Sequence, residues 1–173
     1  MAKKQRGRES AGDMVRSLGL VLLMVGAVFF FARAPSSDEK SIRVVDSTDA
    51  IQAFATAVPG SVVPRDLPRG WRTTVSEYDA RSGLLRVGWV TPKGEYAEYA
   101  AASKPTETFL TDITAGAPRA GTVDIEGSAW TEYRQDKAIS LVRSYGATTV
   151  VLGTLRDTAD LAELRVLAGR LAP

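Results

Sequence analysis

The chain lacks both cysteine and histidine, and these two absences remove the commonest catalytic and metal-binding side chains. Without cysteine there is no disulfide, no thiol nucleophile and no thiolate metal site. Without histidine there is no Ser-His-Asp triad, no imidazole zinc site and no side chain that ordinarily titrates near neutrality. The sequence also has no glycine-rich phosphate loop of either familiar spacing. We therefore predict no enzymatic activity, no catalytic residue, no cofactor and no metal.

An excess of positive charge is found only in the N-terminal segment. Residues 1–33 hold six Lys and Arg against two Asp and Glu, whereas residues 34–173 hold sixteen against eighteen. The sequence pI of 9.0 therefore describes the N-terminal tail and not the rest of the chain. Overall basicity is the usual basis for predicting a nucleic-acid partner. Because that basicity is confined to the tail, we expect no nucleic-acid partner.

One long apolar run follows the basic tail. From Ser17 to Ala32 the chain carries no charged residue. As a helix, these sixteen residues reach about 24 Å, since each residue rises about 1.5 Å. Two more apolar residues and snorkelling of Arg16 and Arg33 bring the span close to the ~30 Å of a bilayer core. The pattern predicts a transmembrane anchor over residues 14–33 with the lipid bilayer as its partner.

The charges before the run predict its orientation. Lys3, Lys4, Arg6 and Arg8 lie in residues 1–13, which we interpret as a basic cytoplasmic tail. Basic residues stay on the cytoplasmic side of a membrane span. We therefore expect a single-pass protein of the cell membrane, with its N-terminus in the cytoplasm and its C-terminal part outside.

A cleaved signal peptide is the alternative reading of this segment. Leu18–Phe31 has the length of a signal-peptide core, and Ala32-Arg33-Ala34 matches the small-x-small cleavage pattern. Pro35 would then follow the cut, where a rigid ring fits poorly. The tail before the run is also long, so we favour an uncleaved signal-anchor.

The remaining sequence predicts one exterior α+β domain over residues 47–173, joined to the anchor by a polar tether over residues 34–46. Ser47 is the expected N-cap of a helix that runs through Val58 and stops at Pro59-Gly60. A proline-rich connector follows over 63–70. Alternating apolar residues and turn signals then predict strands over 71–78, 85–91, 96–102, 121–126, 130–133, 139–145 and 149–155.

Two further helices are expected between and after these strands. The first is capped by Ser103 or Lys104 and buries Phe109, Leu110 and Ile113; the second is capped by Asp157 and carries a leucine stripe from Leu161 to Leu171. Hairpins joined by short turns indicate a mainly antiparallel sheet covered by helices. Two successive β-β-β-α units are consistent with an internal duplication.

Carboxylates and aromatic residues are the remaining candidates for a site. Glu95 and Glu98 differ by three positions, so in one strand they point to opposite faces and make no catalytic pair. Asp124 and Glu126 share a face, where solvated charges on an edge strand are the simpler account. Trp71 and Trp89 fit the alternating core face of adjacent strands. Tyr96 and Tyr99 are the candidate binding surface, because aromatic residues are enriched at interfaces.

Three segments of the sequence carry a resemblance to a known family. They are LPRGW at 67–71, GWVTPKGEYAEY at 88–99 and the closing VVLGTL and LAELRVLAGRL. These segments resemble an actinobacterial family of membrane-anchored proteins, the domain-of-unknown-function family 4245. The resemblance implies a membrane location and this architecture, and it implies no activity or site residue. The LPxGW entry into the first strand also resembles the Mog1/PsbP-like fold.

These observations leave two functional hypotheses. We predict a non-enzymatic protein that binds a partner or acts as a scaffold component of the cell envelope. The alternative is an exterior ligand-binding domain for a glycan, peptide or lipid. A concave aromatic pocket on the sheet would favour the ligand. A flat, exposed apolar patch of several hundred Å² would favour the partner.

Overall fold

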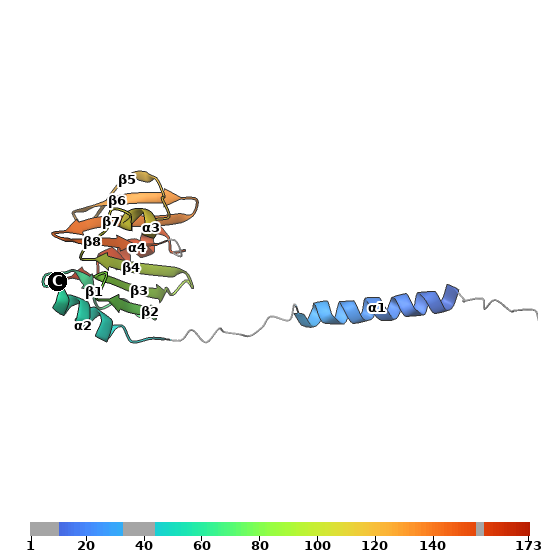
Figure 1. The fold of residues 1–173 in the computed structure, drawn as a ribbon. Helices are drawn as coiled ribbons and strands as arrows, with labels where there is room; N and C mark the ends of the chain where they lie inside the picture. Colours follow the sequence, from blue (N-terminus) through green and yellow to red (C-terminus); the bar gives the residue numbers. More distant parts are fainter. Residues whose placement is uncertain (1–10, 33–43, 155–157) are drawn as a thin grey trace, which may run out of the picture. The chain divides into compact units, whose positions relative to one another are not determined.

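The computed structural model describes residues 11–32, 44–154 and 158–173 (Figure 1). The chain forms two compact units, residues 1–41 and 42–173, and each is described by itself. Most of the predicted tail, most of the predicted tether and the predicted cap Asp157 lie outside the described residues.

The first unit contains one helix, α1 (Ala11–Ala32), of 22 residues. No proline interrupts this segment, so no position in it lacks the backbone N–H that a helix needs. The described side chains of α1, from Val15 to Val25, are exposed. In the described part of the chain, no helix combines the length and the apolar character needed to cross a membrane.

The second unit is built on a seven-stranded sheet with the order β2-β3-β4-β8-β7-β6-β5. Every neighbouring pair in this sheet is antiparallel. The strands are β2 (Arg72–Asp79), β3 (Leu84–Val90), β4 (Tyr96–Ala102), β5 (Arg119–Ile125), β6 (Ser128–Gln135), β7 (Ala138–Tyr145) and β8 (Thr148–Leu152). The prediction of an α+β domain with a mainly antiparallel sheet is confirmed.

The sheet consists of two meanders that meet at one seam between β4 and β8. Tyr99 lies opposite Leu152, and Ala102 lies opposite Thr149. Three strands of the main sheet, β2 to β4, precede helix α3 (Phe109–Ile113), and four, β5 to β8, lie between α3 and helix α4 (Leu161–Ala168). Each meander is thus followed by a helix, as the sequence indicates, although the strand numbers differ and the duplication itself stays a prediction.

One face of the sheet, which we call the core face, is covered by α2 (Thr48–Ala57), by α4 and by a small sheet. The small sheet pairs β1 (Val63–Pro64) with β9 (Leu171–Ala172). Phe54 of α2 and Leu164 of α4 are fully buried in the same cluster as Leu85 and Leu152 of the strands. Trp89 is buried in this cluster, and Trp71 packs edge-to-face on it with ring centroids 6.4 Å apart. The predicted core position is confirmed for Trp89, whereas Trp71 is half-buried and lies just before β2.

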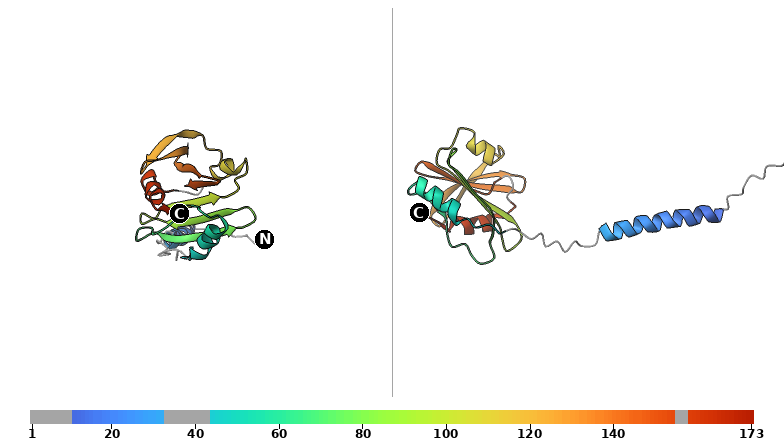
Figure 2. Two further views of the ribbon diagram at one scale, coloured as in Figure 1. Left: turned by 90° about the vertical axis from the view of Figure 1, so that its left-hand side faces the viewer. Right: turned by 60° about the horizontal axis from the view of Figure 1, so that its bottom comes forward.

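The opposite face, which we call the α3 face, is covered far less. A small buried cluster of Ala100, Val142 and Val151 lies under the apolar side of α3. This helix has only five residues, whereas α2 and α4 have ten and eight. Figure 2 shows α3 on the side of the sheet away from α2 and α4. Part of the α3 face is therefore open.

The ends of helices α3 and α4 differ from the predictions. Ser47 is the N-cap of α2, as predicted. The prediction that Ser103 or Lys104 caps the next helix is wrong, because α3 begins at Phe109 with Thr108 as its N-cap. The backbone N–H and the hydroxyl of Ser103 both donate to the Gly83 carbonyl, and these bonds hold the chain beside the β2–β3 turn.

The last helix, α4, is shorter than the predicted helix, whose leucine stripe runs from Leu161 to Leu171. Its N-cap is Asp160, whose side chain accepts from the Glu163 backbone N–H at 2.9 Å, and the Glu163 side chain reaches back to the Asp160 N–H. The helix ends at Ala168, so Leu171 does not belong to it. Leu171 lies in strand β9 of the small sheet, opposite Pro64 of β1. Its backbone is therefore part of a β-ladder and does not continue the helix. The connector predicted over 63–70 accordingly begins with strand β1.

Candidate functional site

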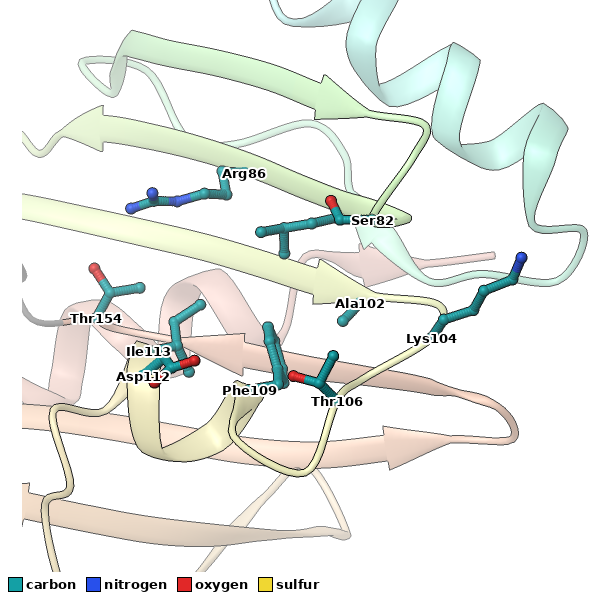
Figure 3. Close-up of a pocket in the computed structure, with 10 residues that line it drawn as sticks. Ser82, Arg86, Ala102, Lys104, Thr106, Phe109, Asp112, Ile113 and Thr154 are labelled. Atoms are coloured by element: carbon teal, nitrogen blue, oxygen red, sulfur yellow. The ribbon is translucent and has the colours of Figure 1, made fainter.

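A pocket of about 390 Å³ opens on the α3 face. Strands β3 and β4, helix α3 and the loop between β4 and α3 contribute its walls (Figure 3). The lining residues are Ser82, Leu84, Arg86, Ala102, Lys104, Thr106, Phe109, Asp112, Ile113 and Thr154. The pocket therefore occupies the part of this face beside the short helix.

An ion pair lies at one end of the pocket. The Arg86 Nε and Nη2 atoms donate to Glu98 Oε1 at 2.7 and 2.6 Å. Arg86 in β3 and Glu98 in β4 meet diagonally, because Glu98 lies opposite Gly88 in the register of the two strands. The Glu98 side chain is 1% exposed and the Arg86 side chain is 36% exposed. A buried carboxylate thus holds a guanidinium that still faces the pocket.

The second carboxylate oxygen of Glu98 is also bonded. The Tyr96 hydroxyl donates to Oε2 at 3.0 Å, and the Thr154 hydroxyl donates to it at 3.1 Å. These donors come from β4 and from the chain after β8. A buried ion pair gives little net stability compared with apolar side chains of the same size. The network is better explained by the fixed orientation that it gives to Arg86.

Gly88 makes this network sterically feasible. It lies on β3 next to Tyr96, and a methyl group at Gly88 would overlap both the hydroxyl and the ring of Tyr96. Strand glycines of this kind mark places where another group approaches the backbone closely. The glycine therefore lets the tyrosine ring lie flat on the strand and reach Glu98.

The other walls of the pocket are mainly apolar. Phe109 and Ile113 come from α3, and Leu84 and Ala102 come from the strands. Figure 3 shows the Phe109 ring standing toward Ala102, while the Lys104 side chain extends away from it. The site therefore combines an apolar body with one oriented cation.

The two predicted binding-surface residues have different positions. Tyr96 is half-buried and touches the site through Glu98. Tyr99 is fully buried in the core face, where its hydroxyl donates to the Val62 carbonyl at 2.7 Å and burial raises its pKa. The two residues are three positions apart in one strand, so their side chains point to opposite faces. Tyr99 therefore presents no binding surface, and the expectation for it is corrected.

The predicted carboxylates do not converge. Glu98 lies in the site, whereas Glu95 precedes β4 at the hairpin turn. Asp124 is exposed on edge strand β5 and accepts from the Gly127 N–H at 3.1 Å, while Glu126 lies in the turn beyond the strand. Within the described ranges, no three His, Cys, Asp or Glu side chains gather in a way that could hold a metal.

Sequence reasoning missed the most informative site residue, Arg86. A usable signal was present, because the Leu84, Arg86 and Gly88 positions form the second face of a strand whose other face is predicted as core. An arginine on such a face of an inner strand needs a partner or a function. Tyr96 and Glu98 repeat the same two-residue spacing on the next strand.

The fold is an α+β domain in which helices cover one face of the main sheet. The other face is partly open, and it holds an apolar pocket beside a buried ion pair. The family model described as "Protein of unknown function (DUF4245)" matches residues 6–171, and the chain belongs to this family. No curated protein and no solved structure matches the chain. The actinobacterial origin and the likeness to the Mog1/PsbP-like fold stay predictions.

Proposed function

We propose that this protein is a non-enzymatic, membrane-anchored binding protein whose exterior domain takes a small amphipathic ligand on the α3 face. The observation that carries the proposal is the pocket of about 390 Å³, with apolar walls and the oriented guanidinium of Arg86. Ligand sites are typically concave and mostly apolar, with a few fixed polar groups. The alternative hypothesis drawn from the sequence, a ligand-binding domain, therefore gains support.

The exposed apolar surface gives less support to a protein partner. In the described part of residues 44–173, the large apolar side chains that are exposed are Val44 and Val166. They belong to the segment before α2 and to α4. Two valines from separate elements fall well short of the several hundred Å² that mark an interaction patch. The partner-binding or scaffold role thus stays a prediction and becomes an outcome of the tests below.

A fragment screen tests the ligand-binding role. The full chain in lipid nanodiscs is screened by saturation-transfer NMR with a library of small amphipathic fragments. In the variant Ala102→Leu a larger side chain fills the pocket, since Ala102 lines it and is almost fully buried. The matched control is Ala129→Leu, at an exposed position of β6. We expect fragments that bind the natural chain and the control, and that lose at least about tenfold in affinity for Ala102→Leu.

Two results would overturn this role. Fragments that bind all three proteins equally would lie outside the pocket, and a library without binders would leave the pocket without a function. Crosslinking in living cells supplies the competing arm, with residues 1–33 fused to an unrelated exterior domain as its control. The scaffold role would be favoured if envelope proteins are captured by the natural chain but not by this control. It would also require that Ala102→Leu captures them equally well.

The membrane placement is the part of the proposal that rests on the sequence. Its support is the uncharged run from Ser17 to Ala32 behind the basic tail, which falls within helix α1. We expect the full-length chain to resist alkaline extraction from membranes, and external protease to digest residues 47–173 in spheroplasts while residues 1–13 stay protected. A mature chain that begins near Ala34 would instead favour the cleaved signal peptide.

A further inference from the structure

Residues 104–117, which contain α3 and which we call the α3 segment, are held to the sheet in an unusual way. Just before the segment, the Ser103 N–H and hydroxyl donate to the Gly83 carbonyl, and just after it the Arg134 N–H donates to the Pro118 carbonyl at 3.1 Å. Within the described chain, every hydrogen bond of the segment itself joins two of its own residues, and none of its charged side chains forms an ion pair. Between its two flanks, apolar packing therefore holds the segment on the sheet.

This packing is light. Phe109, Leu110 and Ile113 of α3 pack on the small buried cluster of the sheet, and all three are only half-buried. Thr114 is the one residue of the segment that is buried, and its hydroxyl donates to the Leu110 carbonyl inside the segment. Regions with few buried apolar contacts open locally at a lower free energy than global unfolding. We expect the α3 segment to open in this way.

A hinge lies at the C-terminal end of the segment. Ala115 and Gly116 both have positive φ angles, of 54° and 70°. This conformation is strained for alanine, because its Cβ atom crowds the backbone. Hinges are a few loop positions that absorb a change of φ and ψ. The two residues can therefore let the segment rotate while Pro118 stays bound to β6.

The sheet beneath the segment presents a straight apolar row. Ala100 of β4 lies opposite Val151 of β8, and Val151 lies opposite Val142 of β7. All three are buried, and adjacent strands lie about 4.8 Å apart. Arg86, which lines the pocket, lies opposite Ala100 on the other side. The row therefore begins at the pocket and runs under α3.

The pocket and the row share the same cover. Phe109 and Ile113 line the pocket, and they also pack on the cluster that forms the row. When the α3 segment lifts, the pocket extends over Ala100, Val151 and Val142. We propose that the α3 segment is a hinged flap, and that the apolar part of the ligand is an unbranched alkyl chain that binds beneath it on this row. The proposal rests on the proposed ligand-binding function.

The shape and chemistry of the row favour such a chain. Its side chains are alanine and valine, so the row offers apolar area and no hydrogen-bonding group. Each buried methylene group of a chain contributes about 0.8 kcal/mol, a constant that corresponds to roughly a fourfold gain in affinity. A chain that lies along the row keeps all its methylene groups on the sheet, whereas a compact ring covers only part of the row.

Thiol labelling tests the flap, because the natural chain has no cysteine. Ala100→Cys places a thiol under the α3 segment, and Ala101→Cys places one on the core face; both positions are fully buried. The full chain in lipid nanodiscs is treated with a membrane-impermeant maleimide. We expect Ala100→Cys to react at least about tenfold faster, at a rate that low urea leaves unchanged, because local opening exposes little surface. Ala101→Cys should react only through global unfolding, faster as urea is added.

A second matched pair keeps this test valid if one variant is poorly folded. Val151→Cys and Val150→Cys repeat the comparison on β8, where both valines are fully buried and point to opposite faces. Circular dichroism establishes that each variant is folded. Equal labelling rates within the folded pairs would overturn the flap.

A further substitution identifies the part that opens. Phe109→Ala, added to Ala100→Cys, should speed labelling at least about fivefold, because the packing of Phe109 on the cluster holds the flap closed. Glu107→Ala, at an exposed position of the same segment, is the control and should leave the rate unchanged. If Phe109→Ala has no effect, another part of the chain opens and the flap is wrong.

Two alcohols with the same number of carbon atoms test the occupant. Octanol has an unbranched chain, and cyclooctanol has a compact ring. Intermolecular NOEs are measured between each alcohol and the valine methyl groups of the natural full chain in nanodiscs. We expect octanol to contact Val142 and Val151 and not Val150 of the core face. We also expect it to shift the Val151 methyl signals at a free concentration at least about tenfold below that of cyclooctanol.

The remaining outcomes distinguish the proposal from the function on which it rests. Octanol without NOEs to Val142 and Val151, or cyclooctanol that binds there equally well, would overturn the alkyl chain. The proposed function would still stand if fragments of the library bind the natural chain and lose affinity for Ala102→Leu. If no such fragment is found and octanol makes no contact with the row, the proposed function fails together with the proposal.

Discussion

The two faces of the main sheet differ in what they bury: one carries the hydrophobic core, and the other carries the pocket and the ion pair. The core face carries Leu85, Val87 and Leu152, all fully buried under α2 and α4. The α3 face carries the ion pair of Arg86 and Glu98, a small apolar cluster and an open pocket. Successive residues of a strand point to opposite faces, so core-face and α3-face side chains alternate along the same strands.

If the proposed function is right, this difference lets one sheet be both stable and available for a ligand. Buried apolar area is the main source of stability, and nearly all of the large buried side chains lie on the core face. The α3 face is therefore free to hold a charged pair and a cavity that add little stability. Substitutions on the two faces should have correspondingly different effects.

The largest expected difference is between two phenylalanines on opposite faces. Phe54 of α2 is fully buried and packs edge-to-face on Tyr78, with ring centroids 5.5 Å apart. We expect Phe54→Ala to lower the free energy of unfolding by about 3–5 kcal/mol. Phe109 of α3 is half-buried beside the pocket, so Phe109→Ala should lower it by less than about 2 kcal/mol and weaken fragment binding. Urea unfolding measures both, and equal losses would contradict the division of the faces.

A second comparison concerns two strand glycines. Gly88→Ala places a methyl group against the ring of Tyr96, whereas the same change at Gly121 of edge strand β5 meets no atom within 4 Å. We expect Gly88→Ala to destabilise the protein by about 1–3 kcal/mol, the cost of an overpacked site. It should also weaken fragment binding, since Tyr96 orients Glu98. Gly121→Ala should leave both quantities nearly unchanged, and a comparable loss there would show that the methyl clash is not the cause.

A smaller effect is expected from removing one buried hydroxyl. Tyr99→Phe deletes the hydrogen bond to the Val62 carbonyl and should cost about 1–2 kcal/mol at neutral pH. Burial raises the pKa of Tyr99, so the folded state keeps a proton that the unfolded state loses above about pH 10. The natural chain should therefore lose stability as the pH rises above that value, and Tyr99→Phe should lose less. Chemical unfolding at several pH values checks this, with half-buried Tyr133→Phe as the control.

The smallest effect is expected from Asp160 at the start of α4. The hydrogen bond from Lys93, at 2.8 Å, and the backbone N–H of Glu163 lower the pKa of this carboxyl. Its contribution is present above the unfolded pKa of about 3.9 and is lost as the pH falls through the lower folded value. Asp160→Asn keeps a capping side chain. Acid unfolding of this variant should depend slightly less on pH than that of the natural chain, and Lys93→Met should show the same change.

The strands were predictable because their signals are local. Alternating apolar residues and turn residues placed all seven strands of the main sheet, and a serine before an apolar helix gave the N-cap of α2. The capping box of α4 is also visible in the sequence as Asp160-Leu-Ala-Glu163, and it makes Asp160 the N-cap in place of the predicted Asp157. The spacing of Tyr96 and Tyr99 also implies opposite orientations, which the prediction of one shared binding surface did not take into account.

The site was less predictable because it depends on strand register. Alternation places Arg86 and Glu98 on some face of β3 and β4, but only the pairing of Gly88 with Glu98 brings the guanidinium to the carboxylate. The Thr154 hydroxyl donates to Glu98, although the two residues are 56 positions apart in the sequence. They meet because β8 pairs with β4. Such long-range pairings carry no local sequence signal.

The seam between β4 and β8 has a consequence for biosynthesis. During translation, β2, β3 and β4 leave the ribosome well before β8, so the β4 edge has no partner until residues 148–152 are made. Exposed strand edges recruit other chains, and pairings between distant segments form slowly. Thr154 reaches Glu98 only once the seam has closed. A chain that is truncated before β8 therefore lacks Thr154 and has an incomplete pocket.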